Sequence, residues 1–324
     1  MMNRELEIWQ FAAEKLKRNE SVMLLVVAES KGSSPGRQGF KMAVAQDEMR
    51  GSVGGGVMEV RLVELAKSKI KNEQLKIDSK IVRQNHRKNT SNPSGMICSG
   101  EQTVVFHQLN YSDLPTICQI VRALKNHQSK VLEITANSLK VLGNQPDDFD
   151  FRFENKNEND FLFEEKLGYK NKLFIVGGGH CALALSELIS KMNFYISLFD
   201  DRESLNTLDK NRFVHEKYII KNYEKIGDFI PSGGNHFVVV MTLGYQSDEI
   251  VIRRLLEKDF KYFGVLGSKA KMAMLFKDLK NEGFSKEILD KIHTPIGLPI
   301  NSRTPEEIAV SIAAEIIRVK NAND

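Results

Sequence analysis

Three consecutive glycines at residues 177–179 are the strongest chemical signal in the sequence. They lie in the run LFIVGGGHCA of residues 173–182, where an apolar, strand-like stretch leads into a helical pattern. Glycine permits the tight turn and lets a phosphate approach the helix N-terminus, where unpaired N–H groups and the helix dipole favour negative charge. Asp200 and Asp201 follow about 20 residues later, the spacing typical of ribose recognition. This segment predicts a nucleotide or cofactor phosphate site, beside which His180 faces either a ligand or its own backbone.

A second glycine-rich loop, GSVGGG, occupies residues 51–56. It follows a predicted strand at residues 40–45 and precedes a helical pattern at residues 57–66, so its N–H groups are candidates for an anion cradle. Arg37 and Lys41 would add positive charge. The alternative is a structural turn between strand and helix, although a turn alone does not require so many glycines.

Cys98 lies in the glycine-flanked run SGMICSG of residues 94–100, which predicts a loop tip. A thiolate there would be a soft metal ligand or a reactive sulfur nucleophile. The alternative is an inert, small apolar residue, which is the usual role of a free cysteine. Cys118 and Cys181 fall on apolar helical faces and are expected in the core. Three cysteines without a pairing pattern indicate reduced thiols rather than a disulfide framework.

The pattern of secondary structure around these motifs predicts an α/β protein of two domains. A chain of 324 residues is too long for one ordinary core. We assign residues 1–144 to an N-terminal α/β domain and residues 167–324 to a C-terminal domain. Strands and helices alternate regularly in the second domain, which predicts a doubly wound parallel sheet. Residues 145–166, rich in Asp, Asn and Glu, are predicted to be a linker.

The composition narrows the classes of partner. The formal net charge is only +4, with 41% hydrophobic and 27% charged residues, and the basic residues are interspersed with acidic ones. We therefore expect no nucleic-acid partner. The sequence contains no apolar run of membrane-spanning length, and residues 1–20 form an amphipathic helical pattern rather than a signal peptide. We expect no membrane partner and a cytoplasmic location.

Motifs from both halves of the chain occur in an order that resembles one known family. In sequence order they are GSSPGRQGFKM, GSVGGGVMEVR, MICSGE, FIVGGGHCALAL, FDDR, GVLGSKAK, PIGL and TPEEIAVSIAAEII. This series resembles the XdhC/CoxI family, the accessory factors of xanthine dehydrogenase and related molybdenum hydroxylases. The resemblance spans nearly the whole chain and implies an XdhC/CoxI domain followed by a Rossmann domain.

The resemblance implies a chaperone that binds molybdenum cofactor (molybdopterin, plain or extended by a nucleotide). Such a protein would hold the cofactor while its terminal sulfido ligand is installed and then insert it into a xanthine dehydrogenase-type molybdenum hydroxylase. A cysteine desulfurase would assist, and no catalytic residue is assigned. A homodimer is also expected, because two-domain proteins of this kind often bury a terminal helix against a partner.

The predicted site residues fall into six segments, three in each half of the chain, and the resemblance implies all of them except Arg37 and Gly178. In the N-terminal half they are Arg37; Gly51, Ser52, Gly54, Gly55, Gly56 and Glu59; and Cys98 and Gly100, with Cys98 the candidate molybdenum ligand. In the C-terminal half they are Gly177, Gly178, Gly179 and His180; Asp200, Asp201 and Arg202; and Gly267, Ser268 and Lys269.

Two other functions remain open from the sequence. An NAD(P)-dependent oxidoreductase would use the same glycine fingerprint, and acids at the end of the second strand would favour NAD over NADP. It would leave the loop at residues 51–56 and Cys98 unexplained, and we find no convincing acid or base for hydride transfer. A nucleotide-sensing regulatory protein without chemistry is the third hypothesis.

Overall fold

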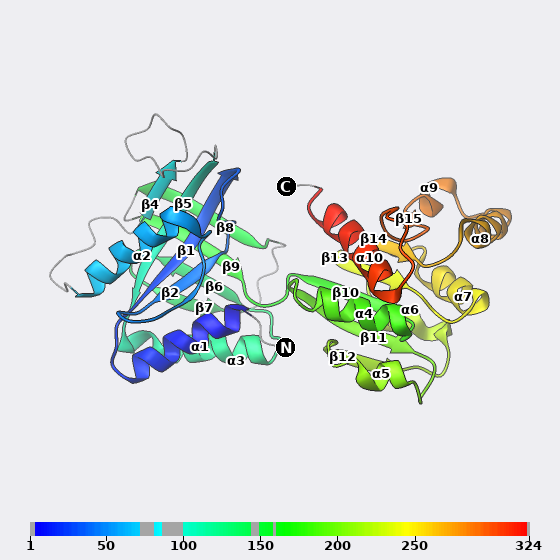
Figure 1. Cartoon of the computed structure of the whole chain (residues 1–324), viewed down its shortest axis with the longest axis horizontal. Coiled ribbons are helices and arrows are strands. Elements are labelled where there is room, and N and C mark those ends of the chain that lie inside the picture. Colours follow the sequence, from blue (N-terminus) through cyan, green and yellow to red (C-terminus); the bar gives the residue numbers. More distant parts are fainter. Residues whose placement is uncertain (1–3, 72–80, 86–99, 144–148, 158–159, 323–324) are drawn as a thin grey trace. The chain divides into compact units, whose positions relative to one another are not determined.

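The structure is a computed structural model that describes residues 4–71, 81–85, 100–143, 149–157 and 160–322. The chain forms two compact units, an N-terminal unit that ends at Gly168 and a C-terminal unit that begins at Tyr169. Each unit has its own hydrophobic core, and each is described by itself (Figure 1).

A five-stranded antiparallel sheet forms the centre of the N-terminal unit, with strand order β3-β2-β1-β5-β4. Helix α2 (Gly56–Lys71) packs on one face, where Leu62 and Ala66 join a buried apolar cluster with strand residues such as Leu25. The strands are β1 (Val22–Gly32), β2 (Lys41–Val44), β3 (Met49–Gly51), β4 (Ile81–Asn85) and β5 (Gly100–Leu109).

The opposite face of this sheet packs against a second, four-stranded antiparallel sheet with order β7-β6-β9-β8. Helices α1 (Arg4–Lys17) and α3 (Leu114–Lys125) contact each other and complete the core (Figure 1). Its strands are β6 (Val131–Thr135), β7 (Leu139–Leu142), β8 (Phe151–Asn157) and β9 (Asp160–Lys166). The large aromatic side chain of Trp9 on α1 is fully buried in this core.

The predicted linker at residues 145–166 is wrong over most of its length, because β8 and β9 occupy it and pair with each other and with β6. Phe161 and Phe163 are two residues apart on β9, so their side chains share one face of the strand, and both are buried. Glu164 and Glu165 of β9 are buried as well and form ion pairs with Arg152 and Lys41. The boundary between the units follows Gly168 instead.

The C-terminal unit is built on a six-stranded parallel sheet with order β12-β11-β10-β13-β14-β15. This is the doubly wound order 3-2-1-4-5-6, so the predicted α/β fold class is confirmed. The strands are β10 (Asn171–Val176), β11 (Phe194–Asp200), β12 (Glu216–Ile219), β13 (Gly233–Val240), β14 (Phe260–Val265) and β15 (Ile292–His293).

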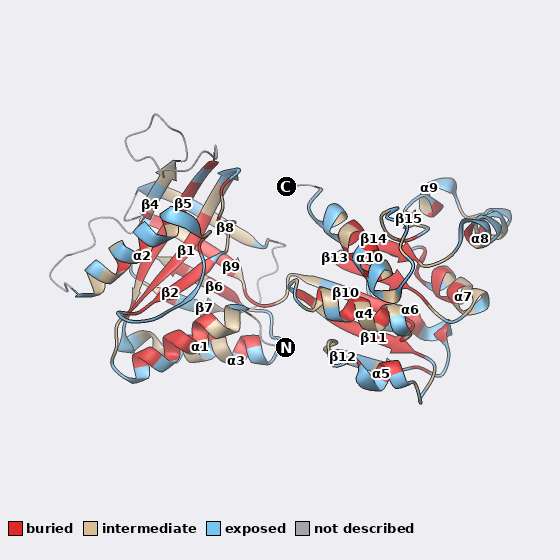
Figure 2. Ribbon diagram, viewed as in Figure 1, coloured by how far each residue is buried: buried red, intermediate tan, exposed pale blue. Residues whose placement is uncertain are grey.

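Helices cover both faces of the parallel sheet, and its central strands are buried on both sides (Figure 2). Continuous apolar runs such as FVVV at residues 237–240 form such strands because neither face meets water. One face is covered by α4 (His180–Ile189), α5 (Asn206–Lys210) and α10 (Pro305–Lys320), the other by α6 (Ile226–Phe229), α7 (Tyr245–Leu255), α8 (Lys269–Asn281) and α9 (Lys286–Leu289). The predicted start of α10 is confirmed, since the Thr304 side chain accepts a hydrogen bond from the N–H of Glu307.

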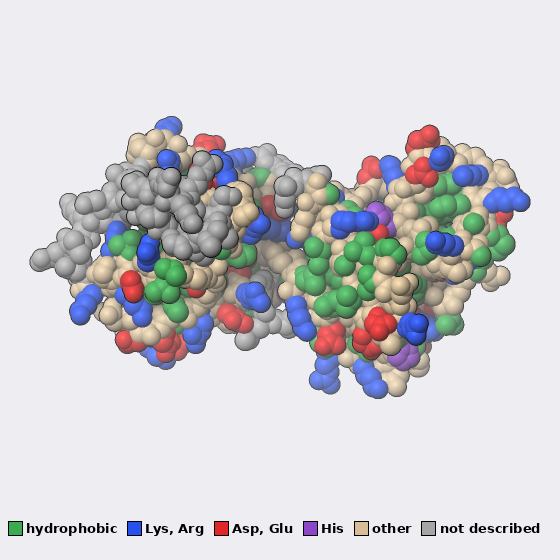
Figure 3. Space-filling view, turned by 45° about the horizontal axis from the view of Figure 1, so that its top comes forward, with side chains coloured by type: hydrophobic (Ala, Val, Ile, Leu, Met, Phe, Trp, Pro, Cys, Tyr) green, Lys and Arg blue, Asp and Glu red, His purple; other side chains and the backbone are tan. Residues whose placement is uncertain are grey.

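The described surface carries both signs of charge. On the face shown in Figure 3, Lys and Arg side chains are interspersed with Asp and Glu side chains on both units. In the part of the chain that the structure describes, no helix has the length and apolar character needed to cross a bilayer.

Candidate functional site

The turn after β10 contains the three glycines of the predicted phosphate site. Gly177 has φ +106°, and a Cβ on it would lie 2.3 Å from the carbonyl oxygen of Met241. No other residue fits here, because both the backbone conformation and the close approach exclude a side chain. The turn therefore packs directly against the loop after β13. Strand order reverses between β10 and β13, the place where open parallel sheets bind ligands.

Gly179 is the N-cap of α4, and open space surrounds it. A Cβ built on Gly179 would meet nothing within 4 Å, and no side chain caps the helix. His180, the first residue of α4, is exposed. The first N–H groups of this helix are thus available to an anionic ligand, as the sequence predicts.

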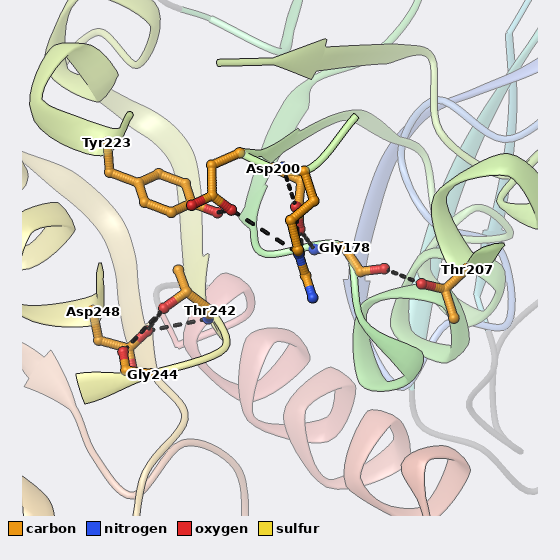
Figure 4. Close-up of polar contacts among 9 residues, drawn as sticks. Gly178, Asp200, Thr207, Tyr223, Thr242, Gly244 and Asp248 are labelled. Atoms are coloured by element: carbon orange, nitrogen blue, oxygen red, sulfur yellow. Dashed lines mark hydrogen bonds and ion pairs between the residues drawn. The ribbon is translucent and has the colours of Figure 1, made fainter. Parts of the chain in front are cut away.

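Asp200, at the end of β11, holds the glycine turn in place (Figure 4). Its Oδ2 accepts hydrogen bonds from the N–H of Gly178 at 2.6 Å and from the guanidinium of Arg202 at 2.8 Å. Its Oδ1 accepts from the N–H and Nε of Arg202 at 2.9 and 2.8 Å. The side chain of Asp200 is fully buried. Burial alone would raise its pKa, but the hydrogen bonds from Arg202 and Gly178 outweigh burial and lower the pKa.

These four donors leave Asp200 no acceptor capacity for a ribose hydroxyl, because a carboxylate offers about four lone-pair positions. Asp201 is the better candidate. Its side chain is 39% exposed, and it accepts one hydrogen bond, from the Tyr223 hydroxyl at 3.3 Å. Burial and the two aspartates raise the pKa of Tyr223, so it stays a neutral donor. Of the two acids that the sequence singles out, Asp200 positions the turn, whereas Asp201, which has only the Tyr223 bond and a 4.0 Å ion pair with Arg202, keeps acceptor capacity for a ligand.

The loops after β13 and β14 lie at the same carboxyl end of the sheet, on the other side of the switch point. Asp248 on α7 accepts hydrogen bonds from the hydroxyl and N–H of Thr242 at 2.5 and 3.1 Å, and pairs with the Lys271 ammonium at 2.7 Å. Lys271 belongs to α8, whose N-cap is Ser268. The Asp248 carboxylate therefore joins the loop after β13, through Thr242, to helix α8, through Lys271. Gly244, the N-cap of α7, has open space around it, as Gly179 does.

The loop after β14 contains the third predicted segment of this half. Gly267, Ser268 and Lys269 lie in the turn into α8, and the Ser268 side chain accepts from the N–H of Lys271 at 3.3 Å. The turns that follow β10, β11, β13 and β14 thus all lie at the carboxyl end of the parallel sheet. Thr242 and Asp248 were not predicted as site residues from the sequence.

In the N-terminal unit, the loop at residues 51–56 does not offer the predicted phosphate cradle. The Oε2 atom of Glu59 accepts hydrogen bonds from the N–H groups of Val53 and Gly55 at 2.8 and 3.0 Å, and from the Ser52 hydroxyl at 2.6 Å. The loop wraps around this carboxylate with positive φ at Gly51, Gly54, Gly55 and Gly56. The cradle interpretation is corrected accordingly: the anion that these amides bind is the chain's own Glu59.

Gln102 on β5 is a central residue of this unit that sequence reasoning missed. Its side chain is buried, and Oε1 accepts from the Ser34 hydroxyl at 2.9 Å and the N–H of Gly36 at 3.2 Å. Its Nε2 donates to the carbonyl of Val53 at 3.0 Å. One amide thus holds the loop before β2 against the glycine loop. Gly100, a predicted site residue on the same strand, allows the Ser34 backbone to approach, since a Cβ there would lie 2.5 Å from the Ser34 nitrogen.

The two basic residues expected beside the glycine loop differ in their surroundings. Arg37 is exposed and donates to the carbonyl of Gly32 at 3.3 Å. Lys41 is buried and pairs with Glu165 at 2.5 Å and Glu5 at 3.2 Å, so it supplies no free charge to a ligand. The prediction for Lys41 is wrong because its charge neutralises acids of α1 and β9.

Cys98, the predicted soft ligand, lies outside the described residues. Among the residues that are described, no group of three or more His, Cys, Asp or Glu side chains could hold a metal ion. Any role of Cys98 therefore stays a prediction.

The change in unfolding free energy of an Asp200→Asn variant tests the role of this carboxylate. We expect a loss of about 2–4 kcal/mol at neutral pH, because the buried amide cannot satisfy both Gly178 and Arg202. A folded-state pKa below the ordinary value of 3.8 stabilises the fold above that value, and the stabilisation is lost as pH falls through the folded pKa. Denaturant titrations between pH 7 and pH 2 should show a larger acid-side loss of stability in the wild type than in the variant.

Asp201→Asn is the matched control, since it changes the neighbouring and more exposed acid. It should alter stability by less than about 1 kcal/mol. Equal losses in the two variants would contradict the positioning role of Asp200.

The parallel sheet and the glycine turn at its switch point define the C-terminal unit as a Rossmann-type domain, with N–H groups at the start of α4 open to a ligand. The N-terminal unit has a different, antiparallel fold. Residues 173–316 match the XdhC Rossmann domain, and residues 16–78 match the XdhC and CoxI family. The chain belongs to the XdhC/CoxI family, the accessory type associated with xanthine dehydrogenase.

Two curated relatives each align with about half of this chain. The protein YqeB of Escherichia coli (strain K12), described as uncharacterized, is 29% identical over 164 residues, 49% of this chain and 29% of its own length. A protein of Bacillus subtilis (strain 168), described as a probable subunit of xanthine dehydrogenase, is 28% identical over 160 residues, 49% of this chain and 46% of its own length. The match thus spans less than half the length of either relative.

A solved structure shares the fold over nearly both complete chains. It is a crystal structure from Bacillus halodurans described as a xanthine dehydrogenase, with a TM-score of 0.72 and 22% identity, covering 100% of this chain and 97% of that one. At this level of identity the likeness shows the fold.

Proposed function

We propose that this chain is a chaperone that binds molybdenum cofactor, holds it for sulfuration and inserts it into a xanthine dehydrogenase-type molybdenum hydroxylase. A cysteine desulfurase would supply the sulfur. Family membership supports the proposal, as does the name of the Bacillus subtilis relative. The cofactor carries a phosphate, or a diphosphate when extended by a nucleotide, and this is the chemistry that an uncapped helix start recognises.

The open turn at Gly179 is the observation that carries this proposal. Asp200 fixes the turn through Gly178, and the space beside Gly179 leaves room for a phosphate at the N-terminus of α4. The residues present therefore fit the anionic end of the cofactor. A phosphate bound there would receive N–H hydrogen bonds from Gly179 and His180.

Purification from a host that makes the cofactor tests the proposal. The chain should retain molybdenum and a fluorescent pterin in equal amounts, and both should be absent after expression in a host that cannot make the cofactor. Protein that carries neither from the producing host would contradict the proposal.

An NAD(P)-dependent oxidoreductase is the second candidate, and the partly exposed carboxylate of Asp201 favours it, since such an acid accepts ribose hydroxyls. Oxidation of NADH by protein free of molybdenum and pterin would support this candidate. No oxidation, together with cofactor retention, would support the chaperone.

Replacement of Cys98 by serine tests the predicted soft ligand. We expect the variant to fold normally and to retain at most about one tenth of the molybdenum, because a hydroxyl is a far poorer ligand for a soft metal than a thiolate. Molybdenum per chain, measured by elemental analysis, is the readout. Cys118→Ser on α3 is the control and should retain the wild-type amount, while unchanged retention in Cys98→Ser would exclude Cys98 as a ligand.

A further inference from the structure

A depression with a charged rim lies at one end of the five-stranded sheet, apart from the residues assigned above to phosphate binding. Its volume is about 220 Å³. The lining residues come from β1, β4 and β5 and are Glu29, Lys31, Arg83, Glu101, Gln102 and Thr103.

Strand register places five of these residues on one face of the sheet. Lys31 pairs with Glu101, and Thr103 pairs with Glu29 on one side and with Arg83 on the other. Paired residues, and residues two apart on a strand, point to the same face. Two carboxylates and two cations thus surround Thr103, which is buried.

In the part of the chain that the structure describes, not all charged side chains of the rim form ion pairs. Lys31 pairs with Glu29 at 3.1 Å. Within the described residues, Arg83 and Glu101 form no ion pair with each other or with a third side chain. A free guanidinium binds phosphate or carboxylate at two points, and a free carboxylate accepts two parallel N–H bonds from an amidine-like edge. The rim therefore offers a guanidinium for an anionic group and a carboxylate for an N–H donor within one small depression.

Strand β5, which lines the depression, also fixes the loops that carry the motifs of this unit. Gln102 separates Glu101 from Thr103 along β5, and its amide holds both Ser34 and the glycine-loop residue Val53. A ligand in the depression would lie against the strand that fixes these loops.

We propose that this depression binds a small polar ligand that combines an anionic group with a heterocyclic N–H donor edge. Arg83 holds the anionic group, and Glu101 accepts from the donor edge. This ligand is distinct from the phosphate that we place at Gly179 in the C-terminal unit.

Fluorescence titration of the purified full chain with neopterin monophosphate, a pterin that carries a phosphate, tests the proposal. Arg83→Ala and Glu101→Gln should each weaken binding about tenfold or more, the effect of losing one charge-assisted hydrogen bond. Arg122→Ala, which removes an exposed arginine of α3, should leave binding unchanged. Wild-type protein that does not bind the probe, or variants that bind it as the wild type does, would overturn the proposal.

Titration with neopterin, which lacks the phosphate, separates the two roles. Arg83→Ala should bind neopterin as the wild type does, whereas Glu101→Gln should still lose about tenfold. Equal losses of both probes in both variants would contradict the division of roles. Thermal unfolding of each variant shows whether it has folded, and both side chains are exposed at the surface, so the fold should be retained.

The two proposals fail in different ways. Molybdenum retained by the wild type, with the pterin phosphate bound equally by wild type and variants, would leave the chaperone function standing and remove this site. Pterin phosphate bound through Arg83 and Glu101, with no molybdenum retained from a producing host, would leave the site standing and remove the chaperone function.

Discussion

Lys41→Met should lower the free energy of unfolding of the N-terminal unit by about 3–5 kcal/mol, the usual result of removing one partner from a buried ion pair. The Lys41 ammonium lies between the carboxylates of Glu165 and Glu5, and the Lys41 and Glu165 side chains are each only 4% exposed. Burial alone would lower the pKa of Lys41, but the two acids outweigh burial and raise it. Methionine fills the same volume, so the loss comes from the carboxylate that stays buried without a cation.

Urea unfolding followed by tryptophan fluorescence measures this loss directly. Trp9 is the single tryptophan of the sequence and is buried in the core of the same unit. Lys140→Met is the control: its side chain is 61% exposed and lies 3.7 Å from Glu133, so the change should stay below about 1 kcal/mol. Adding Glu165→Gln to Lys41→Met should restore part of the stability. A loss below about 1 kcal/mol in Lys41→Met would contradict the buried pair.

The parallel sheet could be predicted from sequence because its signals are local. An apolar run such as residues 173–176, a glycine turn and a helical pattern follow one another within a few residues, and short right-handed connections then leave few possible strand orders. The position of Asp200 beside the turn follows from the same unit. Which of Asp200 and Asp201 is available to a ligand could not be predicted, because it depends on the hydrogen bonds that the Arg202 side chain donates to Asp200.

The N-terminal unit was harder to predict because its determining contacts join distant parts of the chain. Gln102 reaches Ser34, 68 residues away, and Lys41 pairs with Glu165 on a strand that the composition assigned to a linker. Propensity and periodicity carry no information on such pairs. The hydrogen bonds that Glu59 accepts from the glycine loop are different: an acid in the first turn of a helix is a local pattern, and it was available from the sequence.

Gly178→Asp should abolish retention of cofactor by the C-terminal unit. A Cβ at this position would lie 3.2 Å from Oδ2 of Asp200 and 3.2 Å from the Leu208 side chain, so the new carboxylate would enter a site that already buries one. Two like charges this close strongly disfavour the ionised pair, and the added charge also repels a phosphate at Gly179. Molybdenum and pterin per chain, measured after purification from a producing host, should fall to background.

Two further variants separate charge from shape at this turn. Gly178→Ala adds the crowded Cβ without a charge and should retain an intermediate amount of cofactor. Gly234→Asp adds the same charge at the start of β13, where a Cβ would meet nothing within 4 Å, and should retain the wild-type amount. Should Gly178→Asp fold and still hold cofactor as the wild type does, the anionic end of the cofactor must bind elsewhere, because no phosphate at the start of α4 could tolerate that carboxylate.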